Sequence, residues 1–166
     1  EGSSWGNPSC VRKKTDIFNP HGIDLVKNNY GQYQLAVINH SPFESIEMFE
    51  LRKSDSAWDM VWKGCIEVPE EYYFNDIALK KDGLFYASHM YDRDISMQEW
   101  LITTLFKSVS GHVVLWDGSS FNKVVGTEGS GPNGILLDEN SGVLYVNYNQ
   151  GDNLSAYDIN SNTKKG

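Results

Sequence analysis

Two histidines near the start of the chain have the spacing and surroundings of a proton-transfer pair. His21 opens the run His-Gly-Ile-Asp-Leu, and His40 closes the run Val-Ile-Asn-His. We expect the two runs to be neighbouring strands of one small sheet, which allows the two imidazoles to form a hydrogen bond. In such a pair the second ring fixes the tautomer of the first and raises its basicity, so that the first can act as a general base. A single histidine near a strand end is more often structural.

Two later segments of the repeat have an asparagine at the position that His21 occupies in the first. His21, Asn75 and Asn133 begin three similar segments, whose starts lie 54 and 58 residues apart, and Asp76 follows Asn75 directly. Amide and carboxylate oxygens suit a hard cation, calcium above all, which takes about six to eight oxygen ligands. Asn and Asp are also common turn-formers before a strand. Their recurrence at matching positions of the repeat favours a metal site.

The two remaining histidines have weaker signals. His89 ends the second apolar run of its repeat, as His40 does in the first repeat, but Asn75 occupies the place that His21 holds. The sequence therefore predicts no partner imidazole for His89. We expect His89 to lie near the site and His112 to be a residue of a strand.

The segments that must position these residues read as short antiparallel strands. Repeats of this length are typical of solenoids and propellers. The expected strands cover residues 22–26, 34–39, 45–51 and 60–68, then 77–79, 84–88, 112–116 and 122–125, and finally 134–137, 143–147 and 154–159. Four strands per repeat make a propeller blade. The sequence therefore predicts an all-β, partial β-propeller as a single domain over 1–166, with blades at about 20–74, 75–132 and 133–166, the last without its fourth strand.

The geometry of a propeller explains how distant residues meet. The innermost strand of each blade lines the central channel, so equivalent positions converge at one mouth of that channel. Propellers close with at least four blades. We therefore expect this chain to need missing blades from a longer protein, or another copy of itself, to close the ring. Residues 1–19 are expected to carry the tail of an earlier blade.

One segment, 92–109, interrupts the second repeat and predicts a helix. Its apolar side chains fall at helical spacing: Met97, Trp100, Leu101 and Leu105. Asp94 or Ser96 is the expected N-cap. The helix is expected to lie across one face of the propeller. It is either a packing element that covers the blade tops or a wall of the active site, with peripheral lipid contact as a further expectation.

Composition excludes some functions. The net charge is −8, with 22 acidic and 14 basic residues, which argues against nucleic acid as a partner. No apolar run reaches the ~18 residues of a membrane span, and no signal peptide is visible. The segment at Gly129 matches neither a nucleophile elbow nor a phosphate loop, so metal-assisted attack by water is the favoured chemistry.

Cys10 and Cys65 could form a disulfide, although the strand-like surroundings of Cys65 favour a buried free thiol.

Five motifs, in this order and with similar spacing, resemble the paraoxonase (arylesterase/lactonase) family. They are Phe-Asn-Pro-His-Gly-Ile at 18–23, Val-Ile-Asn-His at 37–40, Ser-Ile-Glu-Met-Phe-Glu-Leu at 45–51, Phe-Asn-Asp-Ile at 74–77 and Pro-Asn-Gly-Ile at 132–135. The resemblance runs from about residue 16 to the end of the chain. The Asn-Asp and Asn-Gly motifs are shared with the wider gluconolactonase-like group. The two histidine motifs favour paraoxonases.

The resemblance implies a six-bladed propeller with two calcium ions in its channel. Asn75 and Asn133 match ligands of the catalytic calcium, whereas Asp76 and the backbone carbonyl of Ile23 match ligands of the structural calcium. His21 and His40 match the family's histidine dyad. The family's other ligands, a Glu-Asp pair and an Asp-Asn pair, would fall before residue 1 and after residue 166, so the site within these residues is incomplete. Family habit favours an extracellular or membrane-associated protein.

Three functional hypotheses follow. The first is a calcium-dependent hydrolase of small-molecule lactones and aryl esters, in which His21, oriented by His40, activates water. The second is a sugar lactonase of the gluconolactonase-like group, in which a carboxylate replaces the histidine base. The third is a non-catalytic, calcium-stabilised propeller that binds a partner, because fold does not fix function.

Overall fold

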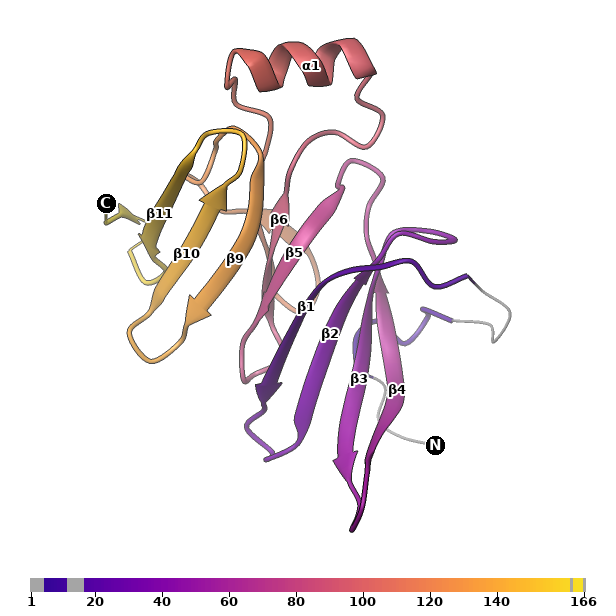
Figure 1. Ribbon diagram of the computed structural model, residues 1–166. Coiled ribbons are helices and arrows are strands. Elements are labelled where there is room, and N and C mark those ends of the chain that lie inside the picture. Colours follow the sequence, from indigo (N-terminus) through magenta and orange to yellow (C-terminus); the bar gives the residue numbers. More distant parts are fainter. Residues whose placement is uncertain (1–4, 12–16, 162, 166) are drawn as a thin grey trace.

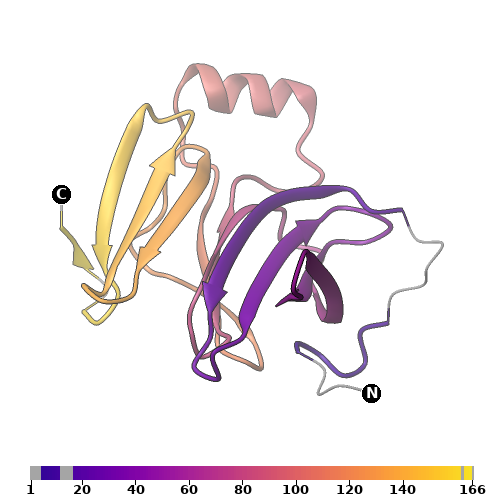
Figure 2. The ribbon, with the colours of Figure 1, turned by 60° about the horizontal axis from the view of Figure 1, so that its bottom comes forward.

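The computed structural model describes residues 5–11, 17–161 and 163–165, and these form three four-stranded antiparallel sheets with one helix. Within each sheet the strands follow one another in sequence order. The first and third sheets lie on either side of the second, and the helix stands at one end of the molecule (Figures 1 and 2). The all-β prediction is confirmed, and the arrangement is compatible with part of a propeller.

The first sheet contains the longest strands, which are β1 (Pro20–Lys27), β2 (Tyr33–Asn39), β3 (Ser45–Lys53) and β4 (Trp58–Glu67). Their apolar residues meet the second sheet, and most residues of β2 and β3 are buried. Pairing of Pro20 with Asn39 brings the start of β1 beside the end of β2. That register places the segments carrying the two predicted catalytic histidines next to each other.

The second sheet contains β5 (Phe74–Leu79), β6 (Phe85–His89), β7 (His112–Trp116) and β8 (Phe121–Lys123). All its predicted strands are present, with β8 shorter than expected. The third sheet contains β9 (Pro132–Asp138), β10 (Val143–Tyr148), β11 (Asn153–Asp158) and β12 (Thr163–Lys164).

The prediction that the third repeat lacks its fourth strand is wrong. β12 has only two residues, and it pairs with β11 through Lys164 opposite Tyr157. The reversal depends on Asp158, whose carboxylate accepts the N–H groups of Asn160 and Ser161 at 2.9 and 3.3 Å. Such a side-chain turn lets the chain reverse within a few residues, so a strand can follow where the hydrophobic pattern has already ended.

The three innermost strands are joined by partly buried carboxylates. Asp24 on β1 accepts the backbone N–H of Leu79 on β5 at 2.7 Å. Asp76 on β5 accepts the backbone N–H of Ile135 on β9 at 2.9 Å. Charge-assisted hydrogen bonds of this kind are stronger than neutral ones. Each inner strand therefore holds the next one through a side chain.

Two apolar clusters fill the spaces between the sheets. The first and second sheets share a cluster that includes Ile38, Met48, Phe74 and Phe85, all nearly inaccessible to solvent. The second and third sheets share a cluster around Val113. Large apolar side chains are buried on both sides of the second sheet. Each fully buried side chain stabilises the fold by about 1.5–3 kcal/mol of transfer free energy. The core is thus made by packing sheet against sheet.

The N-terminal segment corrects one prediction. Cys10 and Cys65 form a disulfide, so the expected free thiol is wrong. Residues 5–11 lie beside β4, where Trp5 donates to the carbonyl of Lys63 at 3.0 Å. That residues 1–19 carry the tail of an earlier blade stays a prediction. A β-carbon at Gly64 would collide with the carbonyl oxygen of Trp5, and Gly64 has φ of +147°. Glycine therefore permits the close approach that brings the two cysteines together.

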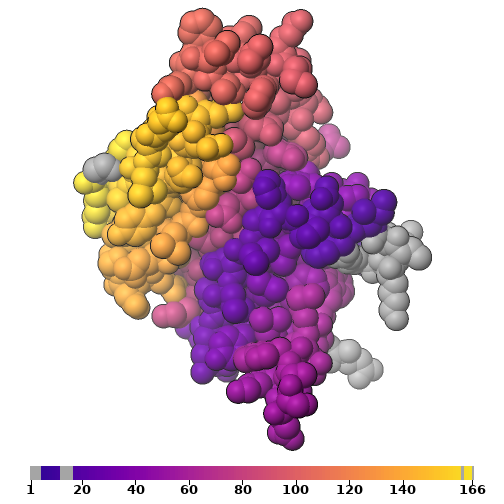
Figure 3. Space-filling model, viewed as in Figure 1, coloured from indigo at the N-terminus to yellow at the C-terminus, as the bar shows by residue number. Residues whose placement is uncertain are grey.

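Helix α1 (Met97–Leu105) lies within the predicted insertion and is shorter than it. Ser96 is its N-cap and forms a capping box with Glu99, so the alternative cap Asp94 is wrong. None of the helix's nine residues is buried. The helix projects from one end of the molecule, as the space-filling view shows (Figure 3). Both alternatives for this segment, a packing element over the blade tops and a wall of the active site, stay predictions.

Few contacts fix the position of the helix. Gln150 donates to the hydroxyl of Thr104 at 2.9 Å, and Lys107 forms an ion pair with Asp152. Both bonds tie the helix to the turn between β10 and β11. No helix in the described part of the chain is long and apolar enough to cross a membrane.

Candidate active site

The structure brings the two predicted histidines together at the junction of β1 and β2. The Nδ1 atom of His21 lies 3.0 Å from Nε2 of His40, and the rings meet edge to face with centroids 5.2 Å apart. His40 follows the last residue of β2, and its backbone N–H donates to the carbonyl of Asn19 at 3.0 Å. The expected hydrogen bond between the two imidazoles is therefore present.

A buried carboxylate completes this group. Both oxygens of Glu44 lie 2.8 Å from Nδ1 of His40. Glu44 is only 6% exposed, and its backbone carbonyl accepts the N–H of Val68 at 3.0 Å, which anchors the loop. Sequence reasoning missed Glu44. The available signal was an acidic residue four positions after a histidine, in a turn between two predicted strands.

His21 has the electrostatics of a neutral imidazole. Burial and the neighbouring His40 lower the pKa of His21, while Asp76 and Glu44 oppose that change. A neutral ring at neutral pH keeps one nitrogen free to accept a proton. His21 can therefore serve as a base, and the nearby carboxylates would stabilise the imidazolium that forms.

The predicted calcium ligand Asp76 lies between the starts of β1 and β9. A β-carbon on Gly22 would lie 2.6 Å from Oδ1 of Asp76, and one on Gly134 would lie 3.8 Å from Oδ2. Burial raises the pKa of this carboxyl, and backbone hydrogen bonds partly offset the rise. Ile23 directly follows Gly22 and pairs with Val37 of β2. The start of β1, which carries Ile23, thus lies against the start of β5.

The two predicted asparagine ligands differ in their surroundings. Asn75 is buried and its amide Nδ2 contacts the sulfur of Met90 at 3.5 Å. Among the described residues, none donates a hydrogen bond to Oδ1 of Asn75, which is the atom that a cation would use. Asn133 is partly buried at the start of β9. The side-chain amide oxygens of Asn75 and Asn133 are ligands of the type that calcium binds.

A serine that sequence reasoning missed links these strands. The hydroxyl of Ser88 donates to the carbonyl of Asn133 at 2.5 Å and accepts the N–H of Asp76 at 3.0 Å. It holds the starts of β5 and β9 in register. Across the described residues, no group of three or more His, Cys, Asp or Glu side chains is placed to hold a metal ion. Among the described residues, the other predicted oxygen donors near Asp76 are side-chain amide and backbone carbonyl oxygens.

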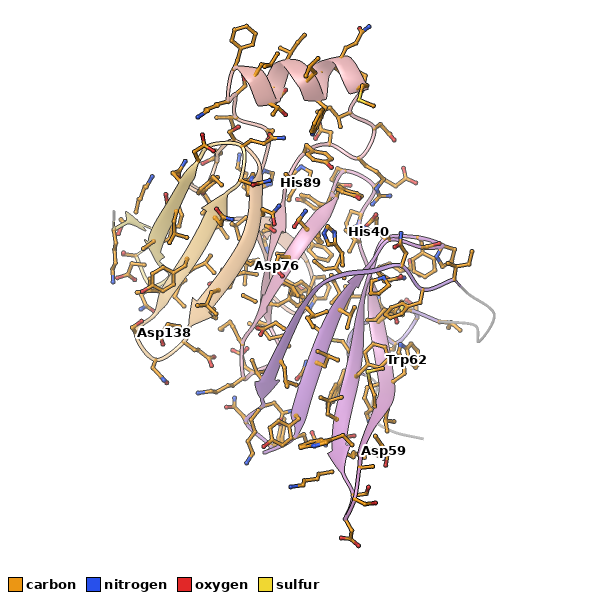
Figure 4. The ribbon with its side chains drawn as sticks, in the orientation of Figure 1. His40, Asp59, Trp62, Asp76, His89 and Asp138 are labelled. Atoms are coloured by element: carbon orange, nitrogen blue, oxygen red, sulfur yellow. A yellow bond between two sulfur atoms is a disulfide. The ribbon has the colours of Figure 1, made fainter. Side chains whose placement is uncertain are left out.

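Two tyrosines extend the histidine pair toward the helix. The ring of Tyr73 stacks on His40 with centroids 4.6 Å apart, and Tyr91 stacks on Tyr73 at 5.6 Å. Nδ1 of His89 accepts a hydrogen bond from the backbone N–H of Tyr73 at 3.1 Å, so His89 lies next to these stacked rings. His40, Asp76 and His89 lie toward the helix end of the sheets, whereas Asp59 and Asp138 lie at the opposite end (Figure 4).

His112 is a strand residue, as predicted. It pairs with His89 across β6 and β7, and their ring centroids lie 5.0 Å apart, so the prediction that His89 has no partner imidazole is wrong. Burial, with the neighbouring His89 and Lys123, lowers the pKa of His112 to about 4. The ring is therefore neutral at neutral pH and serves the packing of the second sheet.

A hydrogen-bonded histidine pair with a buried carboxylate behind it, beside further oxygen donors on an all-β scaffold, is an arrangement that can support general-base catalysis. Residues 11–164 match the Arylesterase family. The chain therefore belongs to this family of esterase-type hydrolases. No curated protein matches the chain.

Proposed function

We propose that the protein is a calcium-dependent hydrolase of lactones and aryl esters. The observation that carries this proposal is the 3.0 Å contact between His21 and His40 beside the carboxylate of Asp76. The match to the Arylesterase family supports ester hydrolysis in general. The dependence on calcium and the choice of lactones and aryl esters as substrates are our own proposals beyond that family match.

The proposed roles divide the site in two. His21 takes a proton from the attacking water, and His40 holds the ring of His21 in place. Asn75 and Asn133 would hold one calcium ion, while Asp76 and the carbonyl of Ile23 would hold a second. Bound calcium would polarise the ester carbonyl and stabilise the developing oxyanion. Oxygen ligands beyond these four would be needed for about six to eight in total.

Calcium should raise the melting temperature of the full chain. A ligand that binds only the folded state stabilises it by about 2.7 kcal/mol at a hundred times its dissociation constant. The Asp76→Asn variant should lose most of the increase, because a neutral amide replaces the only carboxylate in the proposed ligand set. Differential scanning fluorimetry with calcium and with a chelator measures both shifts.

Asp138→Asn is the matched control for this experiment. Asp138 also ends an inner strand, but its carboxylate accepts hydrogen bonds from the turn at Asn140 and Ser141. It lies at the opposite end of the sheets (Figure 4). Its calcium shift should equal that of the unchanged protein. Identical melting with calcium and with chelator in the unchanged protein would remove calcium from the proposal.

We further propose that the helix end of the molecule contacts a lipid surface. Apolar side chains are exposed on and after the helix, including Met97, Leu101, Ile102, Leu105, Phe106 and Val109. Exposed apolar patches of this kind mark interaction surfaces. The small-molecule ester would then reach the site from the same end as the membrane.

Co-sedimentation with phosphatidylcholine vesicles tests this contact. Replacing Leu101 and Leu105 together by serine should weaken vesicle binding by at least about tenfold, because two exposed leucines lose their transfer free energy. Leu154→Ser is the control, since Leu154 is exposed on β11 and not on the helix. Equal sedimentation of the helix variant and the control would exclude the helix as the lipid-binding element.

A further inference from the structure

Glu44 makes an unusual contact with the histidine pair. Both of its carboxylate oxygens lie 2.8 Å from the same ring nitrogen, Nδ1 of His40. The side chain of Glu44 is 5% exposed and that of His40 is 11% exposed. A carboxylate removed from water to this extent requires a hydrogen-bond donor. The ring N–H of His40 is that donor, so Nδ1 of His40 carries a proton.

That proton determines the state of the next ring. When the ring of His40 is neutral, only one of its nitrogens carries hydrogen, and Nε2 is then the acceptor. It faces Nδ1 of His21 at 3.0 Å. Two acceptors cannot form a hydrogen bond, and therefore Nδ1 of His21 carries a proton as well. The remaining nitrogen of His21, Nε2, is left with a free lone pair.

We propose that Glu44 is a positioning residue that sets the tautomers of both histidines and thereby makes Nε2 of His21 the basic nitrogen. The consequence for catalysis rests on the proposed function, in which His21 takes a proton from water. Without an acceptor at Glu44, His40 can place its proton on Nε2 instead. His21 then turns its Nδ1 lone pair toward His40, and its outer nitrogen carries hydrogen and accepts no proton.

The surroundings of Glu44 hold it in this role. The ring of His40 stacks on Tyr73 with an interplanar angle of 14°, which restricts rotation away from Glu44. The Glu44 backbone is held by the N–H of Val68 at 3.0 Å. The carboxylate, the two rings and their hydrogen bonds thus lie in a fixed sequence from the protein interior to the exposed edge of His21.

Nuclear magnetic resonance of the imidazole nitrogens tests the tautomers directly, without any substrate. In the full chain, long-range proton–nitrogen correlations should show hydrogen on Nδ1 of both His21 and His40. In Glu44→Leu, which removes the acceptor at similar size, both rings should show mixed tautomers. Hydrogen on Nε2 of His21 in the unchanged protein, or a charged His40 ring, would overturn the proposal. Unchanged tautomers in Glu44→Leu would overturn it too.

Two further variants separate tautomer control from structural support. Glu44→Gln keeps an acceptor oxygen and should restore the wild-type tautomers that Glu44→Leu loses. Glu50→Gln is the matched control on the adjacent strand β3, where Glu50 bonds to Arg52 and Gln32 and not to a histidine. Should Glu44→Leu fail to fold, the unchanged protein and Glu44→Gln still decide the matter, since hydrogen on Nε2 of His21 in either overturns the assignment.

Kinetics link the tautomers to the proposed function. Glu44→Leu should lower kcat on an aryl ester by about 10–100-fold with little change in KM, as loss of a partner behind a functional histidine does. The Glu44→Gln variant should recover part of that loss. A protein with the expected tautomers but no ester turnover would contradict the proposed function and leave the tautomer assignment standing.

Discussion

A His21→Gln variant is expected to hydrolyse aryl esters and lactones about 10²–10⁴-fold more slowly than the unchanged protein. This is the range that general-base catalysis contributes, and a glutamine amide cannot take a proton from water. His21 is exposed at the start of β1, and its side chain contacts Nε2 of His40. The fold should therefore survive the change, and kcat should fall more than KM rises.

Initial rates on phenyl acetate and on a simple lactone measure this effect. His112→Gln is the control, because His112 lies between β6 and β8 and its ring faces His89 rather than the site. That variant should keep its turnover. Activity that persists in His21→Gln would favour the sugar-lactonase hypothesis, in which a carboxylate is the base. Calcium-dependent melting of an unchanged protein that hydrolyses neither substrate would favour a binding module.

Replacing Cys10 and Cys65 together by serine should lower the free energy of unfolding by about 2–4 kcal/mol. The disulfide closes a loop between residues 55 positions apart, so its loss frees a long segment in the unfolded state. Both cysteines are buried, at 5% and 0% exposure. Release of residues 5–11 would also break the backbone hydrogen bonds from Trp5 and Asn7 to β4.

Urea unfolding with and without a reductant measures the disulfide's contribution. Reductant should bring the unchanged protein close to the stability of the double variant, and it should leave the double variant unaffected. Equal stability of the oxidised and reduced forms would show that the segment at 5–11 holds to β4 through its other contacts alone.

Much of the scaffold could be predicted from the sequence because its signals are local. Alternation of apolar residues over 45–51 predicts a strand, although the structure buries both of its faces over residues 45–50. The pairing of Tyr33–Asn39 with Ser45–Lys53 follows from a short connection. The contact between His21 and His40 was predictable for the same reason, since both belong to adjacent strands. Equivalent repeat positions likewise placed Asp76 near the start of the neighbouring inner strand.

The missed residues act through contacts that no pattern in the chain reports. Glu44 looks like an ordinary charged turn residue, and only the path of the loop after His40 turns its carboxylate inward. Asp24 and Ser88 are polar residues within strands, and their partners lie in other sheets. Cys65 has a strand-like neighbourhood that hides its pairing with Cys10. Such contacts depend on how the sheets meet, which strand periodicity does not encode.

Two hydrogen bonds between sheets limit how the sheets can move. Asp24 accepts the backbone N–H of Leu79, and Asp76 accepts that of Ile135. Rotation of one sheet against the next would pull a charged oxygen away from a buried N–H, which is costly in a medium of low polarity. These hydrogen bonds therefore hold neighbouring sheets together at their inner edges. The side chains of the proposed site come from three sheets, and these hydrogen bonds would keep their spacing before any ligand binds.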